Sequence, residues 1–282
     1  MKLTGAGRIA GIIGWPVAQT LSPLLHGFWL AEHGIDGALV PLPVKPEHFA
    51  VVVTALMKAG FRGVSVTIPH KEAAFALAHE TDLAARAAAA ANLLIFHDNG
   101  RIEGRNTDAI GLSASLREEI GDLSGRPAIL LGAGGAARAT VVALQVCGVS
   151  EIRILNRTKS RADQLAAQLA PHIKSRLIVV DSWPVAAKDV ALVVNTTSAG
   201  MKGAPSLDLP LDTLPKDAAV CDIVYNPLET PLLHKARTHG LRTVDGLGML
   251  MHQAVPAFEA FFGVTPKVTP ALRRHLEDAL RG

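Results

Sequence analysis

The sequence predicts an α/β fold in which two domains each carry a mostly parallel sheet. Short apolar runs of strand length alternate with segments of helical periodicity along most of the chain, which is the pattern of strands joined by crossover helices. This alternation begins again after Gly125-Arg126-Pro127, so the chain contains two successive series of elements. Its 282 residues are enough for two modest domains or one large one.

The first series predicts three parallel strands joined by helices, followed by a hairpin. Strands are expected where apolar runs are bounded by glycine or proline, and a proline near the first turn is typical of a helix start. Asn99-Gly100 is a strong hairpin signal, so an antiparallel pair of strands should flank it. The expected elements are strands Ile9–Ile13, Leu39–Val44 and Phe61–Ile68, helices Pro23–His33 and Pro46–Ala59, and hairpin strands Ala91–Phe96 and Arg101–Gly104.

The second series predicts more strands and helices in alternation and then two helices with no strand after them. Because helices without a following strand must bury their apolar sides elsewhere, we expect the last two to pack back on the first domain. The predicted domains are 1–106 together with 238–282, and 107–237. The expected elements are strands Ala128–Leu131, Glu151–Leu155, Arg176–Val180, Val190–Val194 and Ala218–Ile223, and helices Ala136–Val146, Ser160–Leu169, Met249–Phe262 and Thr269–Leu280.

Composition and charge exclude several classes of protein. The 28 basic and 25 acidic residues are dispersed without a basic block, so nucleic-acid binding is not expected. No apolar run approaches the ~18 residues that span a bilayer, and the N-terminus lacks the pattern of a secretory signal. Cys147 and Cys221 lie among apolar residues, as buried thiols of a reducing compartment do. The eleven histidines include no pair with metal-ligand spacing. We therefore expect a cytoplasmic protein without a metal.

A glycine-rich turn between a predicted strand and a predicted helix indicates a dinucleotide cofactor. Residues 132–137 fit the pattern G-x-G-x-x-A. Gly132 permits the tight turn, Gly134 lets the backbone approach a pyrophosphate, and Ala137 lets the helix pack closely on the strand. The N–H groups at the helix start then favour phosphate. The alternative is a glycine-rich turn that binds nothing.

The residues after the next predicted strand distinguish NADP from NAD. NAD-binding proteins carry an acidic residue there for the ribose hydroxyls, whereas this chain has Asn156-Arg157-Thr158, with Arg161 just beyond. Arginine can pair with a 2′-phosphate, which an acidic residue would repel. The sequence therefore favours NADP, and the alternative is that both arginines belong to a solvated helix start.

Polar side chains stand at the ends of several predicted strands. Lys71 lies in the segment Ser65–Glu72, and Asp108 closes Gly104–Asp108. If these strand ends converge, the lysine can exchange a proton with an alcohol oxygen while the aspartate orients it. Thr20 and Ser22 precede a helix, where hydroxyls can cap the helix or donate to a ligand. The pattern alone leaves both uses open.

These segments, taken together, resemble the shikimate dehydrogenase family, whose members use NADP to reduce 3-dehydroshikimate to shikimate. The resemblance runs through nearly the whole chain in the family's order. It implies an N-terminal substrate domain and a C-terminal Rossmann-type NADP domain. The matching segments are Gly14–His26, Val64–Glu72, Ala91–Asn92, Gly104–Asp108, Gly132–Ala139, Asn156–Thr158, Asn195–Met201, Asp222–Pro231 and Asp245–Gln253.

The resemblance also implies a role for individual residues. Lys71 and Asp108 would be the catalytic pair. The implied substrate-binding residues are Thr20, Ser22 and Tyr225 for the carboxylate, Lys71, Asn92, Asp108 and Gln253 for the ring hydroxyls, and Thr67 at the border of the site. The implied cofactor-binding residues are Gly132, Ala133, Gly134, Gly135, Ala136, Ala137, Asn156, Arg157, Thr158, Arg161, Thr196, Ile223, Gly246 and Met249.

The chain departs from the family pattern at three positions and leaves several alternatives open. Thr20 stands where the family usually has serine, Gly27 where asparagine is usual, and Leu93 where threonine is common. The extra methyl group of Thr20 could shift preference toward quinate. The alternatives are a quinate/shikimate or aminoshikimate dehydrogenase of the same fold, a folate-linked methylene dehydrogenase, and a non-catalytic dinucleotide-sensing protein. A monomer and a homodimer are both compatible with the sequence.

Overall fold

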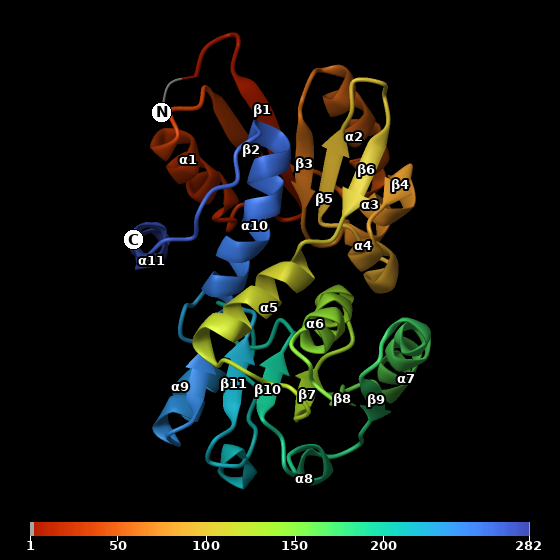
Figure 1. Cartoon of the computed structure of the whole chain (residues 1–282), viewed down its shortest axis with the longest axis vertical. Coiled ribbons are helices and arrows are strands. Elements are labelled where there is room, and N and C mark those ends of the chain that lie inside the picture. The colour runs from red at the N-terminus through yellow and green to blue at the C-terminus, as the bar shows by residue number, and fades with distance from the viewer. Residues whose placement is uncertain (1–2, 282) are drawn as a thin grey trace. The chain divides into compact units, whose positions relative to one another are not determined.

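The computed structural model of the chain describes residues 3–281, which form two compact α/β units (Figure 1). The first unit comprises the described residues up to Thr107 together with Gln253–Ala279. The second comprises Asp108–His252 and the last described residues. Each unit contains one six-stranded sheet, so the predicted α/β class with two mostly parallel sheets is confirmed. The division by function into 1–106 with 238–282, and 107–237, stays a prediction.

The first unit is built on a sheet with the strand order β2-β1-β3-β5-β6-β4. Strands β1, β2 and β3 are parallel, as their crossover helices predict. The Asn-Gly turn joins two antiparallel strands, β5 and β6, and β5 is also antiparallel to β3. The strands are β1 (Arg8–Gly14), β2 (Gly37–Pro43), β3 (Gly63–Val66), β4 (Glu80–Thr81), β5 (Leu93–Phe96) and β6 (Ile102–Arg105).

The hairpin strands do not form the edge of this sheet, because β4 adds beyond them. β4 pairs with β6 in parallel over two residues, which is too short a run to leave a periodic pattern in the sequence. The sequence also missed two short helices next to it. The helices and helical turns of this part of the chain are α1 (Ser22–Glu32), η1 (Pro46–His48), α2 (Phe49–Lys58), α3 (Lys71–Leu77) and α4 (Leu83–Ala88).

Two groups of side chains form the core of the first unit. Helices α2, α3 and α4 pack apolar residues against Val64 and Val66 of β3. A separate aromatic cluster joins α1 to the C-terminal part of α10 (Gly246–Phe262). In this cluster Trp29 meets Phe258 edge-on, with ring centroids 5.4 Å apart, and the Trp29 indole donates to the carbonyl of Lys267. The prediction that the final helices pack on the first domain is therefore confirmed; the last of them is α11 (Pro270–Arg281).

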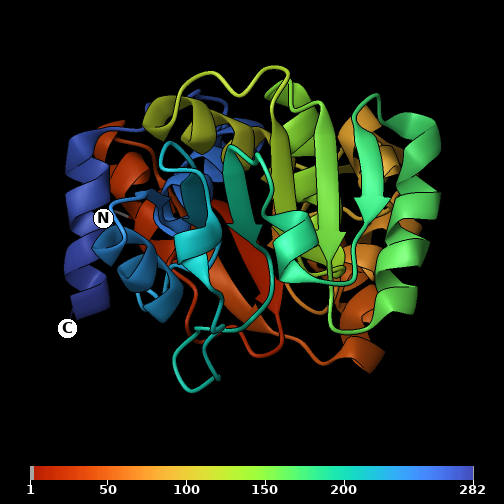
Figure 2. The same cartoon turned by 90° about the horizontal axis from the view of Figure 1, so that it is seen from below.

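The second unit is a fully parallel sheet with the strand order β12-β11-β10-β7-β8-β9. Figure 2 shows β7 and β8 side by side and parallel. The strands are β7 (Pro127–Leu131), β8 (Glu151–Leu155), β9 (Arg176–Val179), β10 (Leu192–Asn195), β11 (Ala219–Asp222) and β12 (Arg242–Val244). The helical elements are α5 (Asp108–Glu119), α6 (Gly135–Val146), α7 (Lys159–Leu169), η2 (Ala170–His172), α8 (Trp183–Ala186), η3 (Leu211–Thr213) and α9 (Pro231–Thr238).

Both faces of this second sheet are covered, which explains its continuous apolar strands. Along β7, Ala128 and Leu130 face a core that includes α5, α6 and α7. The alternate residues Ile129 and Leu131 face a second core that includes α8 and α9. Among the described residues, every helix is too short or too polar to cross a membrane.

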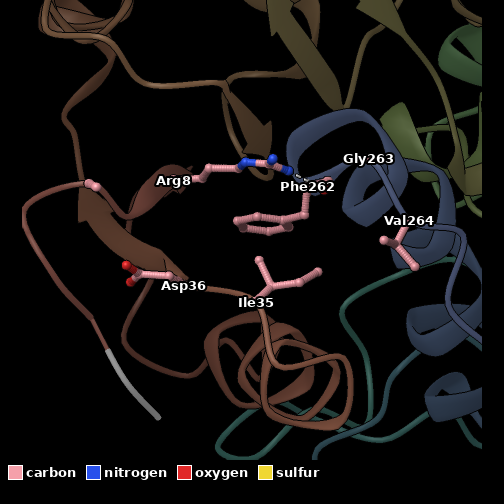
Figure 3. A pocket seen from close by; sticks show the side chains of 7 residues that line it. Arg8, Ile35, Asp36, Phe262, Gly263 and Val264 are labelled. Carbon is pink, nitrogen blue, oxygen red and sulfur yellow. Dashed lines mark hydrogen bonds between the residues drawn. The ribbon is translucent and has the colours of Figure 1, made fainter.

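A shallow pocket lies at the amino end of β1 in the first unit. Figure 3 shows its labelled lining residues, among them Arg8, Ile35 and Asp36. The Arg8 guanidinium donates to the carbonyl of Phe262 at 2.5 Å, so its charge is already engaged by the protein. Because β1 runs from Arg8 to Gly14, this pocket is at the opposite sheet edge from the polar strand ends that the sequence singled out.

Candidate functional site

Ligands of open α/β sheets bind outside the carboxyl ends of the parallel strands. In the first unit, backbone hydrogen bonds draw the segments after β1 and β3 together at that edge. Thr67 N donates to Ile13 O at 2.9 Å, and Trp15 N donates to Ile68 O at 3.0 Å. The half-buried Thr67 therefore stands beside the end of β1.

Thr20 and Ser22 bring two hydroxyl groups to the start of α1. The Thr20 hydroxyl lies 3.2 Å from the Ser22 hydroxyl and accepts from Ser22 N at 3.3 Å. The residue before the helix is Leu21, and no side chain caps the helix there. Ser22 is buried and Thr20 half-buried. Both hydroxyls therefore lie at a helix N-terminus, where backbone N–H groups favour an anion.

Lys71 is the first residue of α3, and its neighbour His70 fixes the start of that helix. The His70 ring is buried, lies 2.7 Å from the carbonyl of Val44 through Nε2, and stacks on Phe49 with centroids 4.8 Å apart. The carbonyl of Lys71 accepts from Ala91 N at 2.9 Å. These contacts hold the Lys71 backbone while its side chain stays half-buried.

Asn92, Thr107 and Gln253 form a cluster of polar side chains at the same edge. The Asn92 side-chain oxygen accepts from Thr107 N at 2.8 Å, and its amide donates to the Thr107 hydroxyl at 3.0 Å. The oxygen of Gln253 lies 3.5 Å from the Asn92 amide and 3.4 Å from the Thr107 hydroxyl. Because β5 is antiparallel to β3, the start of β5 brings Asn92 to the end of β3.

Asp108 follows Thr107 directly and begins α5. Its side chain is 5% exposed, so its carboxyl group is held within the protein rather than in solvent. By compactness Asp108 belongs to the second unit, whereas Lys71 belongs to the first. The pairing of their side chains stays a prediction. Two other acidic residues of this part of the sequence have different environments: Glu72 is exposed, and Asp82 caps α4 by accepting from Ala85 N at 2.6 Å.

In the second unit, the glycine-rich turn has the geometry that a pyrophosphate needs. Gly132 has φ +106°, which favours glycine, and a Cβ there would lie 2.8 Å from the Thr196 hydroxyl. At Gly134 and Gly135 a Cβ would meet nothing within 4 Å. This space lies open before the N-terminus of α6. Ala137 is fully buried, as close packing of the helix on β7 requires. The intervening Ala133 and Ala136 are half-buried.

The turn after β8 presents its polar groups to solvent. Asn156 is half-buried and donates from its amide to the carbonyl of Thr158 at 2.7 Å, which closes the turn. Arg157, Thr158 and Arg161 are exposed. The two guanidinium groups therefore stand at the carboxyl end of a strand next to β7, and they are accessible to a ligand.

Five further predicted residues lie on or after β10, β11 and β12. Thr196 donates from its hydroxyl to the carbonyl of Leu131 at 2.7 Å, which ties the segment after β10 to the glycine-rich turn. Gly246 is packed against the backbone of Ile223, so a side chain there would clash. Met249 and Tyr225 are half-buried. All of these residues belong to the second unit, as does the turn itself.

One group of side chains among residues 3–281 is close enough to hold a metal ion. It consists of Glu80, His97 and Glu103, whose ligand atoms lie within 4.8 Å of one another. Both glutamates already have cationic partners, because Arg101 lies 2.6 Å from Glu80 and Arg105 lies 2.5 Å from Glu103. We assign no function to this group.

Comparison with known proteins identifies the family. The sequence model described as the shikimate dehydrogenase substrate binding domain matches residues 12–94, and that of shikimate/quinate 5-dehydrogenase matches residues 115–204. A curated relative, the shikimate dehydrogenase (NADP(+)) of Methylobacterium radiotolerans, is 52% identical over 277 residues, covering 97% of this chain and 98% of the relative. The chain belongs to the shikimate dehydrogenase family.

Solved structures that are similar to this chain share its fold, but they are named for different substrates. The shikimate 5-dehydrogenase of Thermus thermophilus in complex with NADP(H) and shikimate has a TM-score of 0.84 and 34% identity, covering 97% of this chain and 98% of that one. The quinate dehydrogenase of Corynebacterium glutamicum in complex with NAD has a TM-score of 0.87 and 29% identity, covering 98% and 99%. The fold of the family therefore does not by itself decide between shikimate and quinate.

Two buried polar residues, one in each unit, were not singled out by the sequence. Thr107 contacts both Asn92 and Gln253, and Asp222 is buried at the end of β11. Thr107 lies within a motif that the sequence did recognise, but its importance depends on pairing between distant strands. Asp222 has only one local signal, which is an acidic residue at the end of an apolar strand.

Proposed function

We propose that this protein is an NADP-dependent shikimate dehydrogenase, which reversibly reduces 3-dehydroshikimate to shikimate in the biosynthesis of aromatic amino acids. The observation that carries this proposal is the set of hydroxyl, amide and lysine groups at one sheet edge, in a chain whose curated relative bears that name. A polyhydroxylated ring acid needs many hydrogen-bond partners, and this edge supplies them.

The substrate would be held by side chains at that edge. Thr20 and Ser22, together with Tyr225, bind the carboxylate, which the N-terminus of α1 also favours. Asn92 and Gln253 bind ring hydroxyls, and each has both donor and acceptor atoms for this purpose. Thr67 limits the space available to the ring. The contacts between Thr20 and Ser22, and between Asn92 and Gln253, preorganise these side chains, which reduces the entropy that binding must overcome.

Lys71 acts as the general acid in reduction and as the general base in oxidation. When bound, NADPH supplies the hydride that reduces the ring carbonyl. Lys71 Nζ donates a proton to the carbonyl oxygen as negative charge develops there, so the product is a neutral alcohol. Asp108 accepts a hydrogen bond from the lysine and keeps it oriented toward the reacting oxygen. In the reverse direction, Lys71 takes the hydroxyl proton.

The residues of the second unit fit a bound NADP. The open space before α6 admits a pyrophosphate, and N–H groups at the helix start bind it (Gly132, Ala133, Gly134, Gly135, Ala136 and Ala137). The exposed Arg157 and Arg161 can bind the 2′-phosphate, assisted by Asn156 and Thr158. The nicotinamide is expected beside Ile223, Gly246 and Met249, and Thr196 lines the same cleft.

Quinate is the second candidate substrate. The observation that favours it is Thr20, whose methyl group changes the shape of the carboxylate site relative to serine, and a relative of the same fold is named as a quinate dehydrogenase. That relative is in complex with NAD. In this chain, the arginines after β8 favour NADP over NAD as the cofactor.

The deciding experiment is an absorbance assay for reduced nicotinamide in four parallel reactions. Purified protein receives shikimate or quinate, each with NADP⁺ or NAD⁺. Turnover that is strongest with shikimate and NADP⁺ is expected. Turnover mainly with quinate or NAD⁺ would reassign substrate or cofactor, and inactivity in all four reactions would overturn the proposal. We further propose that the enzyme works in the cytoplasm, as a monomer or homodimer, with no nucleic-acid partner.

A further inference from the structure

Asp222 connects two segments of the second unit that we assign to different ligands. It is the last residue of β11, next to the end of β10 in the sheet (Figure 1). One carboxylate oxygen accepts from the Asn195 side-chain amide at 3.0 Å and from Val224 N at 3.1 Å. The other accepts from the Thr230 hydroxyl at 2.8 Å. Each partner belongs to a different segment of chain.

This group of polar side chains is entirely buried and internally satisfied. Asp222, Asn195 and Thr230 are all 0% exposed. Burial raises the pKa of Asp222, whereas its three hydrogen bonds lower it by less. A buried carboxylate costs free energy, and one that is retained with three donors is a strong constraint on the groups that it holds.

Asn195 links Asp222 through hydrogen bonds to the segment that we assign to the nucleotide. The oxygen of Asn195 accepts from Thr197 N at 3.0 Å and from the Thr197 hydroxyl at 2.8 Å, and its amide also donates to Ala199 O at 3.3 Å. Thr196 lies between Asn195 and Thr197 in the chain, and its hydroxyl donates to the carbonyl of Leu131, the residue before the glycine-rich turn. Asn195 therefore depends on Asp222 for its orientation and in turn shapes this loop.

Val224 links Asp222 through its backbone to the segment that contains Tyr225. Val224 N donates to Asp222 and Val224 O accepts from Gly246 N at 3.3 Å. The backbone between Ile223 and Tyr225 is thus fixed on two sides. A shift at Asp222 would move Tyr225, which we assign to the substrate carboxylate, and Ile223, which we assign to the nicotinamide.

We propose that Asp222 is a positioning residue that sets the cofactor loop after β10 and the Tyr225 segment at the same time. This proposal rests on the proposed function for the identity of the two ligands. It predicts that one substitution, at a residue that touches neither ligand, weakens the binding of both.

The test compares three variants whose effects on the buried group differ. Asp222→Ala leaves Asn195, Val224 N and Thr230 without their acceptor. Asp222→Asn is the conservative variant, because its side-chain oxygen can still accept from Asn195 and Val224 while its amide donates to the Thr230 hydroxyl. Thr230→Val removes the hydrogen bond to the other carboxylate oxygen of Asp222. It also removes the cap of α9, where the Thr230 hydroxyl accepts from Leu233 N. The hydrogen bonds of Asp222 with Asn195 and Val224 stay intact.

Dissociation constants for NADP⁺ and for shikimate are measured by ligand-dependent fluorescence, with melting temperature and turnover alongside. We expect Asp222→Ala to raise both constants about tenfold or more, the scale of a buried hydrogen bond left unmade. Asp222→Asn should restore both to within about threefold. Thr230→Val should lower the melting temperature while both constants stay near the wild-type values.

The proposal is overturned if Asp222→Ala lowers the melting temperature as Thr230→Val does and binds both ligands like the wild type. It is also overturned if only one constant changes. If Asp222→Ala does not fold, Asp222→Glu takes its place, because it keeps the charge and displaces the carboxylate by one methylene group. Wild-type turnover with shikimate and NADP⁺ judges the proposed function separately, because it does not depend on the Asp222 variants.

Discussion

The backbone of Lys71 is held in place by contacts of neighbouring residues. His70 is held between the carbonyl of Val44 and the ring of Phe49, and Ala91 N binds the carbonyl of Lys71. A lysine side chain is flexible, so a general acid of this type needs a fixed backbone to keep its amine near the reacting oxygen. Glu72, one residue later in the same helical turn, is exposed to solvent.

Replacing Lys71 tests the acid–base assignment. We expect Lys71→Ala to lower kcat by about 10²-fold or more, within the usual size of general acid–base effects, while KM for shikimate changes little. The measurement is steady-state absorbance with shikimate and NADP⁺. Glu72→Ala is the matched control and should keep wild-type turnover. An unchanged kcat in Lys71→Ala would remove the lysine from the mechanism.

His26 is a titratable residue in the core of the first unit. Its ring is 1% exposed and lies among Trp29, Phe258, Phe261 and Phe262, with centroid distances between 5.7 and 6.4 Å. Burial lowers the pKa of His26 to about 3. The folded protein therefore holds the neutral ring, and protonation favours the unfolded chain, in which the pKa returns to about 6.5.

The stability that depends on neutral His26 is complete above about pH 6.5 and is lost as the pH falls toward about 3. Between about pH 6.5 and about pH 4.5 the loss amounts to about 2 kcal/mol, because the slope approaches about 1.4 kcal/mol per pH unit only below the unfolded pKa. Urea denaturation at these two pH values measures the loss in free energy of unfolding. We expect this loss to be smaller in His26→Leu than in the wild type by this amount. His172→Leu, at an exposed histidine, should behave like the wild type. Equal pH dependence in all three proteins would contradict the assignment.

At the scale of elements, the sequence predicts what is encoded locally and misses what tertiary packing decides. Five of the six strands of the second sheet could be recognised, because both faces are covered and residues such as Ile129 and Leu130 make continuous apolar runs. The three-residue β12 was missed. Helix α5 was missed because its buried face carries Gly111, Ser113 and Ser115, which give little apolar periodicity. Small residues are needed on this face, because Ser115 closely approaches Gly248 of α10 and a side chain at Gly248 would clash with it.

The same distinction applies to the site. The glycine-rich turn could be predicted because its conformation is set by adjacent residues, and Gly132 does adopt a positive φ. The cluster of Asn92, Thr107 and Gln253 could not be derived from local pattern, because it joins residues 146 and 161 positions apart in the chain. It depends on the antiparallel pairing of β5 and on the return of α10 to the first unit.

The turn between β8 and α7 carries the prediction on cofactor choice. Because Arg157 is exposed, its removal should cost little stability. We expect Arg157→Ala to raise KM for NADP⁺ by about 10- to 100-fold, the scale of a lost charge-assisted hydrogen bond, and to leave KM for NAD⁺ unchanged. Arg176→Ala is the matched control, since Arg176 is exposed at the opposite end of the same sheet. Equal losses with both cofactors would show that Arg157 does not read the 2′-phosphate.

At the scale of the whole molecule, each unit has its own sheet and its own core, so each can be stabilised by its own ligand. The glycine-rich turn and the exposed arginines belong to the second unit, whereas Thr67, Lys71 and Asn92 belong to the first. A ligand stabilises the structure that binds it by RT ln(1 + [L]/Kd), which is about 2.7 kcal/mol at a hundredfold excess over Kd. Local opening of the backbone is suppressed most where the ligand binds.

Amide hydrogen exchange can therefore map the two ligands onto the two units. With NADP⁺ alone, we expect slower exchange at residues 132–137 and 195–197, and with shikimate alone at residues 67–71 and near Asn92. NAD⁺ at the same concentration is the control and should protect the second unit less, because it lacks the 2′-phosphate. Protection of only the first unit by NADP⁺ would contradict the assignment of the cofactor. The segment 223–225 should be protected by either ligand, because the chain places there both a residue assigned to the nicotinamide and one assigned to the substrate carboxylate.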